Sequence, residues 1–180
     1  MTMQLQERAT TLLILNRKAL RFLLLFGLIF GTSYFFVGLA PGVRLGIIKP
    51  FTAFLASAVT AIINSFGARA WAEGTIVRSS SYSINIAMGC DGIEASSLFL
   101  ACVLAFPTSL RAKLTGLGIG IPVIQVINLA RLVSLYYAGV YLPSIVEGLH
   151  VYVAQTIVIF LTTGLFILWL ERFATEHRRA

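Results

Sequence analysis

Five apolar runs constrain the fold of this chain more than any other feature of its sequence. They cover residues 20–40, 51–66, 92–106, 114–140 and 151–170. A helix crosses the hydrocarbon core of a bilayer with about 17 to 25 apolar residues, so most of these runs are long enough and two fall short. Hydrophobic residues make up 58% of the 180 residues and charged residues 12%, more apolar surface than one water-soluble core of this size can bury. The sequence therefore predicts a single-domain, all-α polytopic membrane protein over residues 1–180, with about four to six transmembrane or interfacial helices.

Basic residues gather where the apolar runs stop. The net charge is +7, from 14 Lys and Arg against 7 Asp and Glu. The clusters are Arg17, Lys18 and Arg21, then Arg111 and Lys113, then Arg172, Arg178 and Arg179. Because loops on the cytoplasmic side of a membrane are enriched in Lys and Arg, we expect both chain ends and the loop before Arg111 to lie inside. The same placement favours a lipid bilayer as partner and argues against nucleic acid.

The second apolar run decides how many helices cross the membrane, because five full crossings cannot leave both chain ends on one side. The segment 44–67 has one apolar stripe and an opposite face of small and polar residues, among them Ser57, Thr60 and Asn64. We expect this segment to lie in the outer interface or to enter the membrane partially. The true crossings are then expected at 20–40, 91–106, 114–140 and 150–170. The alternative is a full crossing that packs through the small face, with an outside N-terminus or one further crossing.

A polar, serine-rich stretch interrupts the apolar runs between residues 74 and 89. Tyr82, Ile84 and Ile86 alternate with polar residues there, next to a cluster of serines. Alternation with a period of two is typical of a half-buried strand, and the serine cluster indicates a turn. The pattern predicts a small β-hairpin on the outer side, whose second strand leads the chain to Cys90.

Cys90 stands where this hairpin meets the third apolar run, in Gly89-Cys-Asp-Gly-Ile-Glu94. Asp91 and Glu94 have the spacing of a capping box, which predicts a helix that begins directly after the cysteine. A thiol at a helix N-terminus faces the positive end of the helix dipole, which favours the nucleophilic thiolate. The two carboxylates oppose that effect, so a cation is needed nearby. The second cysteine, Cys102, would lie about 18 Å away along a helix, too far for a disulfide, and we interpret it as a packing residue.

Arg131 is the cation best suited to this role. It lies inside an apolar run, where a charge is costly and usually functional, and Asn128 shares its helical face. His150 opens the last apolar run, whereas the only other histidine, His177, lies in the charged tail.

The predicted depths of these three residues agree. Counted as helical rise from the inner ends of their runs, Cys90, Arg131 and His150 lie about 24, 26 and 28 Å above the inner interface, near the outer edge of the core. A thiolate, an imidazole and a fixed cation at one depth can carry out acyl transfer. The thiolate attacks, the histidine moves protons, and the arginine stabilises the oxyanion.

The same residues, in this order, resemble the motifs of the exosortase/archaeosortase family. They are Cys-x-Gly-Ile at Cys90, Asn-x-x-Arg ending at Arg131, and His150 at the start of the following helix. The resemblance covers the chain from about Phe51 to the end of the last helix. Many relatives carry Ser and Arg where this chain has Asp91 and Glu94, so it is most similar to a short, exosortase H-like member.

The resemblance implies a cysteine transpeptidase of the bacterial inner membrane, with its active site facing the outside. The substrates would be exported proteins with a C-terminal sorting signal of the PEP-CTERM kind: a short motif, a transmembrane helix and a basic tail. Cys90 would form a thioester with the cleaved protein and pass the acyl group to an acceptor on the outer face, a lipid or a glycan. No cofactor and no metal are expected.

Three other classes of function compete with this interpretation. A phosphatase or phosphotransferase would need more than one histidine and a denser basic cluster on the outer side than this sequence has. A metal-dependent intramembrane hydrolase would take its ligands from Asp91, Glu94, Glu147 and His150. A single histidine in that set and the lack of an HExxH motif argue against it. A non-enzymatic membrane subunit would tolerate substitution of Cys90. For Arg131 the alternative role is a structural ion pair with Asp91 or Glu94.

Overall fold

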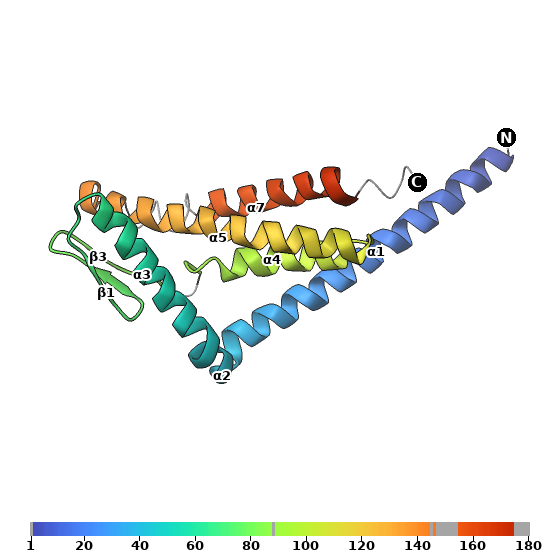
Figure 1. Ribbon diagram of the computed structural model, residues 1–180. Coiled ribbons are helices and arrows are strands. Elements are labelled where there is room, and N and C mark those ends of the chain that lie inside the picture. The colour runs from blue at the N-terminus through green and yellow to red at the C-terminus, as the bar shows by residue number, and fades with distance from the viewer. Residues whose placement is uncertain (1, 88, 145, 147–154, 175–180) are drawn as a thin grey trace.

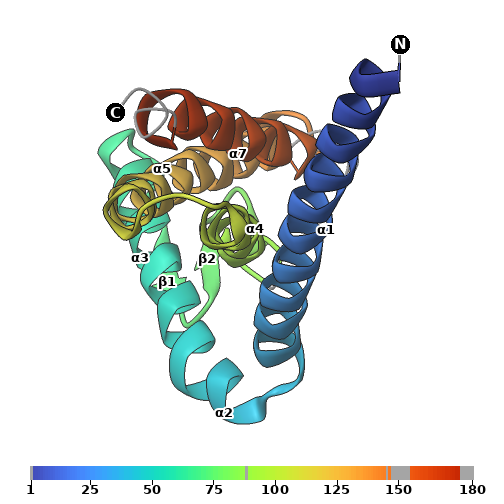
Figure 2. The same ribbon diagram turned by 90° about the vertical axis from the view of Figure 1, so that its right-hand side faces the viewer.

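The computed structural model describes residues 2–87, 89–144, 146 and 155–174 as a helical membrane protein with one small sheet (Figure 1). Its helices are α1 (Thr2–Leu39), α2 (Pro41–Val43), η1 (Arg44–Ile48, a π-helical turn), α3 (Lys49–Ser65), α4 (Ile93–Ala105), α5 (Leu110–Tyr141), α7 (Gln155–Trp169) and η3 (Leu170–Ala174). The strands are β1 (Trp71–Glu73), β2 (Ile76–Arg78) and β3 (Ser83–Asn85). α1 and α3 form a V with α2 at its apex, while α4, α5 and α7 pack against one another (Figure 2).

Small residues on α5 let its neighbours approach closely. A Cβ added to Gly120 would collide with the ring of Phe99 on α4, and one added to Gly116 would collide with Trp169 on α7. Close approach through small residues is a usual way for membrane helices to pack, because lipid gives no hydrophobic driving force between them. The indole N–H of Trp169 also donates to the carbonyl of Ala112 (3.0 Å), which ties the end of α7 to the start of α5.

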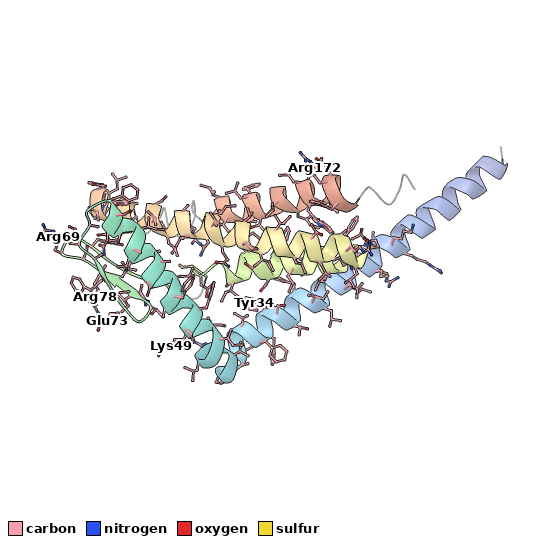
Figure 3. The ribbon with its side chains drawn as sticks, viewed as in Figure 1. Tyr34, Lys49, Arg69, Glu73, Arg78 and Arg172 are labelled. Atoms are coloured by element: carbon pink, nitrogen blue, oxygen red, sulfur yellow. The ribbon has the colours of Figure 1, made fainter. Side chains whose placement is uncertain are left out.

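The basic ends of α5 and α7 meet at one end of the bundle, as the charge pattern predicts. Lys113 donates to the carbonyl of Leu104 across the short α4–α5 connection (2.6 Å), and η3, which carries Arg172, contacts α5. Figure 3 shows Arg172 at this end and Arg69 and Arg78 beside the sheet at the other. The two ends of the bundle therefore differ. The basic ends of α5 and α7 lie at one end, and the sheet lies at the other.

The sheet packs onto α3 and the second half of α5. Its order is β1-β2-β3, with both pairs antiparallel. Val77 of β2 is fully buried with Ile63 of α3 and Leu132 of α5, and the hydroxyl of Tyr136 lies 2.7 Å from the Ser79 hydroxyl. The predicted hairpin is confirmed as β2 and β3. Strand β1 was not predicted, because Trp71, Ala72 and Glu73 are all exposed and show no alternation.

The observed helix lengths change which of the predicted segments is the least able to cross a membrane. Four segments are long and apolar enough to cross a membrane: Arg17–Leu39, Pro41–Ser65, Leu110–Tyr141 and Thr156–Phe173. Among the predicted runs the short one is α4, with 13 residues, and not the segment 44–67, of which residues 44–65 belong to the 25-residue span Pro41–Ser65. Whether that segment crosses fully or lies in the interface stays a prediction.

Several predicted helix limits need correction. The helix expected at 20–40 begins at Thr2, and the one expected at 114–140 covers Leu110–Tyr141, since Ser109 accepts from the N–H of Ala112 as its N-cap. The helix expected at 91–106 covers only Ile93–Ala105. It stops there because Phe106, which precedes a proline, takes an extended conformation (ψ 132°). For the helix expected at 150–170, the described part covers Gln155–Trp169.

Candidate active site

Cys90 lies on a tight turn between β3 and α4. Its N–H donates to the carbonyl of Ala87 (3.0 Å), and the N–H of Ile86 donates to Thr75 in the sheet (2.9 Å). Gly89 has a φ of +87°, a conformation that residues with a Cβ rarely adopt. Cys90 is 7% exposed and forms no disulfide with Cys102, as predicted. The turn therefore holds the cysteine inside the protein, at the junction of the sheet and the helices.

The start of α4 differs from the predicted capping box. The N-cap is Gly92, with φ +74°, and the helix begins at Ile93. Asp91 instead accepts the N–H of Ile93 at Oδ1 (3.0 Å). Its side chain is 1% exposed, and Oδ2 has no hydrogen-bond partner among the described residues. The helix does not start directly after the cysteine because Gly92 first turns the chain through a left-handed conformation.

Asn128 of α5 fixes this turn from the opposite side. Its Nδ2 donates to the carbonyl of Cys90 (3.0 Å), and the side chain is fully buried. A Cβ on Gly92 would lie only 3.0 Å from Cγ of Asn128. Glycine is needed at position 92 for two reasons, its left-handed backbone and the close approach of this amide.

Arg131, one helical turn after Asn128 on α5, reaches the same turn. Its Nη1 lies 3.5 Å from the carbonyl of Gly89 and 3.4 Å from Oδ1 of Asn128, two long hydrogen bonds, and its Nε is buried without a partner in the described part of the chain. The structure thus brings Cys90, Asn128 and Arg131 together, as their order in the sequence predicts. The guanidinium keeps donors available for an oxygen of a bound molecule.

The alternative role of Arg131 as a structural ion pair finds no support in the described residues. There, no carboxylate lies within ion-pair distance of Arg131, and the ion pair present joins Arg78 to Glu73 on the surface of the sheet (2.7 Å; Figure 3).

The thiol of Cys90 is in an environment that opposes ionisation. Burial raises the pKa of Cys90 above its ordinary value, the Arg131 guanidinium acts to lower it, and the carboxylates of Asp91 and Glu94 add to the increase. Burial also raises the pKa of Asp91. Burial and the two carboxylates therefore oppose the predicted activation of the thiol by the helix start, and α4 begins three residues after Cys90 and not directly after it. Arg131 is the side chain that favours the thiolate, which is the role the sequence predicts for it.

The third predicted catalytic residue, His150, lies outside the described residues, as does Glu147. The proposed imidazole therefore stays a prediction. Within the described ranges, no group of three or more His, Cys, Asp or Glu side chains could hold a metal ion. Asp91 and Glu94 alone do not form the metal site considered above.

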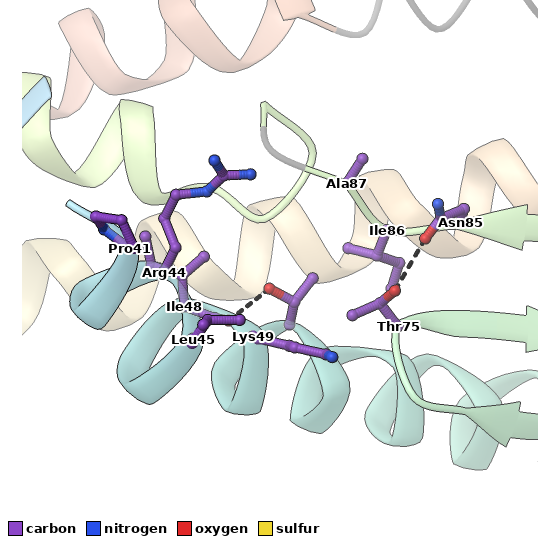
Figure 4. A pocket seen from close by; sticks show the side chains of 10 residues that line it. Pro41, Arg44, Leu45, Ile48, Lys49, Thr75, Asn85, Ile86 and Ala87 are labelled. Carbon is purple, nitrogen blue, oxygen red and sulfur yellow. Dashed lines mark hydrogen bonds between the residues drawn. The ribbon is translucent and has the colours of Figure 1, made fainter. Parts of the chain in front are cut away.

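A cavity of about 520 Å³ borders the chain segment that leads to Cys90. Arg44 and Lys49 line it from the helical side, and Asn85 and Ala87 line it from the sheet side (Figure 4). Ala87 accepts the N–H of Cys90, so the cavity opens next to the turn. Of the residues that line the cavity, Ala87 is the one nearest to Cys90 in the sequence.

Comparison with known proteins identifies the family of this chain. The chain matches the family model of transmembrane exosortases (Exosortase_EpsH) over residues 8–172. This chain is a member of the transmembrane exosortase family. No curated protein and no solved structure matches it. At the level of the family, an exosortase is a membrane-embedded sorting transpeptidase that processes exported proteins with sorting signals.

Sequence reasoning missed two features of this exosortase site. Arg44 lines the cavity beside the turn, and its signal is a basic residue that precedes the second apolar run in Pro41-Gly-Val-Arg44. Gln125, one helical turn before Asn128, donates to the hydroxyl of Ser96 (3.0 Å) and so joins α5 to α4 just below the turn. Its signal is an uncharged polar residue on the same helical face as Asn128 and Arg131.

The charges around Cys90 in the exosortase can be tested by alkylation. The thiolate is the reactive form, so the rate of alkylation by a small reagent should rise with pH around the raised pKa of Cys90. Arg131→Gln should move the midpoint of that rise to higher pH, because it removes the cation that lowers the pKa of Cys90. Asp91→Asn should move it to lower pH. The measurement uses protein in which Cys102 is replaced by Ala, and equal midpoints in all three proteins would contradict the electrostatic description.

Proposed function

We propose that this exosortase is a cysteine transpeptidase whose nucleophile is Cys90, assisted by Arg131 and His150. The observation that supports it is the buried contact of Asn128 and Arg131 with the turn that carries the thiol. A structural arginine inside an apolar bundle is expected to pair directly with a carboxylate, and among the described residues no carboxylate lies within ion-pair distance of Arg131. Its position is explained if it serves a charge that develops at Cys90 during the reaction.

The proposed reaction has two acyl-transfer steps. The thiolate of Cys90 attacks the carbonyl carbon of the scissile peptide bond, and the oxygen of that carbonyl takes up the negative charge beside Arg131. When the C–N bond breaks, the leaving amine takes a proton, which we assign to His150 as general acid. The resulting thioester then reacts with a nucleophile of the acceptor. A new acyl bond forms, the C–S bond breaks, the thiolate is restored, and the proton of the acceptor nucleophile passes to His150.

The substrates proposed are exported proteins whose C-terminus carries a short motif, a transmembrane helix and a basic tail. The basic helix ends of the exosortase would lie on the cytoplasmic side of the bacterial inner membrane, and the sheet and Cys90 would lie toward the outside. A substrate helix with a basic tail has the same orientation, so its outer end would reach the level of the turn.

Mass spectrometry of a substrate tests this function. Exported proteins with such tails, isolated from cells that contain this exosortase, should end before the transmembrane helix and carry the mass of an attached group at the new C-terminus. The same proteins from cells that lack it should keep the whole tail. Identical intact tails in both cells would contradict the proposal, and a new free carboxylate would show hydrolysis in place of transfer.

A further inference from the structure

Strand β3 presents an open edge five residues before Cys90. Among the residues that the structure describes, it pairs with β2 alone, through Ile76–Asn85, Val77–Ile84 and Arg78–Ser83. The hydrogen bonds from Ser79 to Tyr82 and from Ile86 to Thr75 show which residues face β2, since bonded and non-bonded pairs alternate in an antiparallel ladder. Tyr82, Ile84 and Ile86 point their backbone groups toward β2. Ser83 and Asn85 therefore point their N–H and C=O groups to the open edge.

This edge faces a cavity of about 390 Å³. Four consecutive residues of the chain line it, Tyr82 to Asn85, together with Leu135, Pro143 and Val146. Side chains alternate between the two faces of a strand, so a cavity that touches four residues in succession lies along the edge and not on one face. The outward N–H and C=O groups of Ser83 and Asn85 thus border an open space with an apolar wall.

The same edge leads toward the candidate nucleophile. Asn85 lines both this cavity and the larger one that borders Ala87, next to the Cys90 turn. The strand also lacks the usual protection of an open edge. Its three residues are Ser83, Ile84 and Asn85, with no charge and no proline, whereas exposed edges are usually blocked by such residues. An open, unprotected edge that leads into a site is suited to pairing with another strand.

We propose that β3 binds the segment of the sorting signal around the cleavage point as an added fourth strand. This inference rests on the proposed function and extends it to how the substrate is held. An extended peptide offers donors and acceptors on every second residue, which matches the spacing of Ser83 and Asn85. Up to four backbone hydrogen bonds would form, and one side chain of the peptide would enter the apolar space beside Leu135 and Pro143. The paired peptide would then continue past Asn85 to the thiol.

Binding to a protein that cannot cleave tests this inference. The Cys90→Ala protein, in lipid nanodiscs, is titrated with a fluorescent synthetic peptide that covers the segment before the transmembrane helix of one such exported protein. Ser83→Pro removes an outward N–H without touching the ladder to β2, and it should weaken binding about tenfold, the effect of losing one hydrogen bond worth about 1.4 kcal/mol. Ser83→Ala keeps the N–H and should bind like its parent.

A scan of N-methylated peptides gives a second test that needs no change in the protein. Methylation of alternate peptide nitrogens should weaken binding with a period of two residues. Equal affinities of Ser83→Pro and Ser83→Ala without such a period would overturn strand addition, as would no peptide binding at all. Cleavage of the same peptide by the unchanged protein is measured separately. If the peptide is cleaved but methylation shows no period of two, strand addition is contradicted and the transpeptidase function is retained. If the period is found but the peptide is not cleaved, the transpeptidase function is contradicted and strand addition is retained.

Discussion

Replacement of Cys90 by Ala should abolish processing of exported proteins with the sorting tail while the exosortase stays folded in the membrane. The thiol is the only group in the proposal that bonds to the substrate, so its loss should lower the rate about a thousandfold or more. The change removes one small buried atom from a turn whose backbone bonds to Ala87 and Asn128 are unaffected. Intact tails, measured by mass spectrometry, are the expected result.

Cys102→Ala provides the matched control. Cys90 precedes α4 by three residues, whereas Cys102 lies within the helix, 12 residues further along the chain. This variant should process tails at the normal rate. Normal processing by Cys90→Ala would remove the transpeptidase mechanism and would leave a non-enzymatic membrane subunit as the better interpretation.

Replacement of Arg131 by Lys should lower the turnover rate by about 10² to 10³, the usual effect of removing one oxyanion donor. Lysine keeps the positive charge but loses the planar guanidinium, in which Nη1 alone contacts Gly89 and Asn128 and the other nitrogens keep donors available. Turnover is measured on a tailed protein in lipid nanodiscs. Arg111→Lys, an exposed residue at the start of α5, should have no effect.

The alkylation of Cys90 separates the two roles of Arg131. Since lysine retains the charge, Arg131→Lys should leave the pH midpoint of alkylation nearly unchanged, whereas Arg131→Gln should raise it. A loss of turnover with an unchanged midpoint assigns the guanidinium to the developing oxyanion. Near-normal turnover of Arg131→Lys would reduce the residue to a source of positive charge.

The meeting of Cys90 and Arg131 was predictable because it depends on helical rise, which sequence reports well. The apolar runs that connect Cys90 and Arg131 to the inner interface contain nearly the same number of residues. Counting the helical rise along each run therefore placed both residues at one depth. Asn128 was predictable for the same reason, since it lies one helical turn from Arg131. Its hydrogen bond to the carbonyl of Cys90 was not, because that contact depends on the conformation of a turn.

The features that the sequence did not predict are those set by non-local contacts or by a positive backbone φ angle. The left-handed conformation of Gly92 displaced the start of α4 and moved Asp91 out of the capping position. Strand β1 forms only because β2 offers it a partner, and no local pattern in Trp71–Glu73 indicates it. Burial of Cys90 raises the pKa of its thiol, an effect opposite to the activation that the helix start predicted.

The shortness of α4 has a consequence for where the cut is made. Thirteen residues rise about 20 Å, roughly 10 Å less than the hydrocarbon core. If the α4–α5 connection lies at the inner interface, the turn after which α4 begins lies below the outer headgroups and not level with them. The substrate must then unwind the outer end of its own helix to present a peptide bond there. A thioester formed at that depth would meet little water and would survive until an acceptor arrives by lateral diffusion.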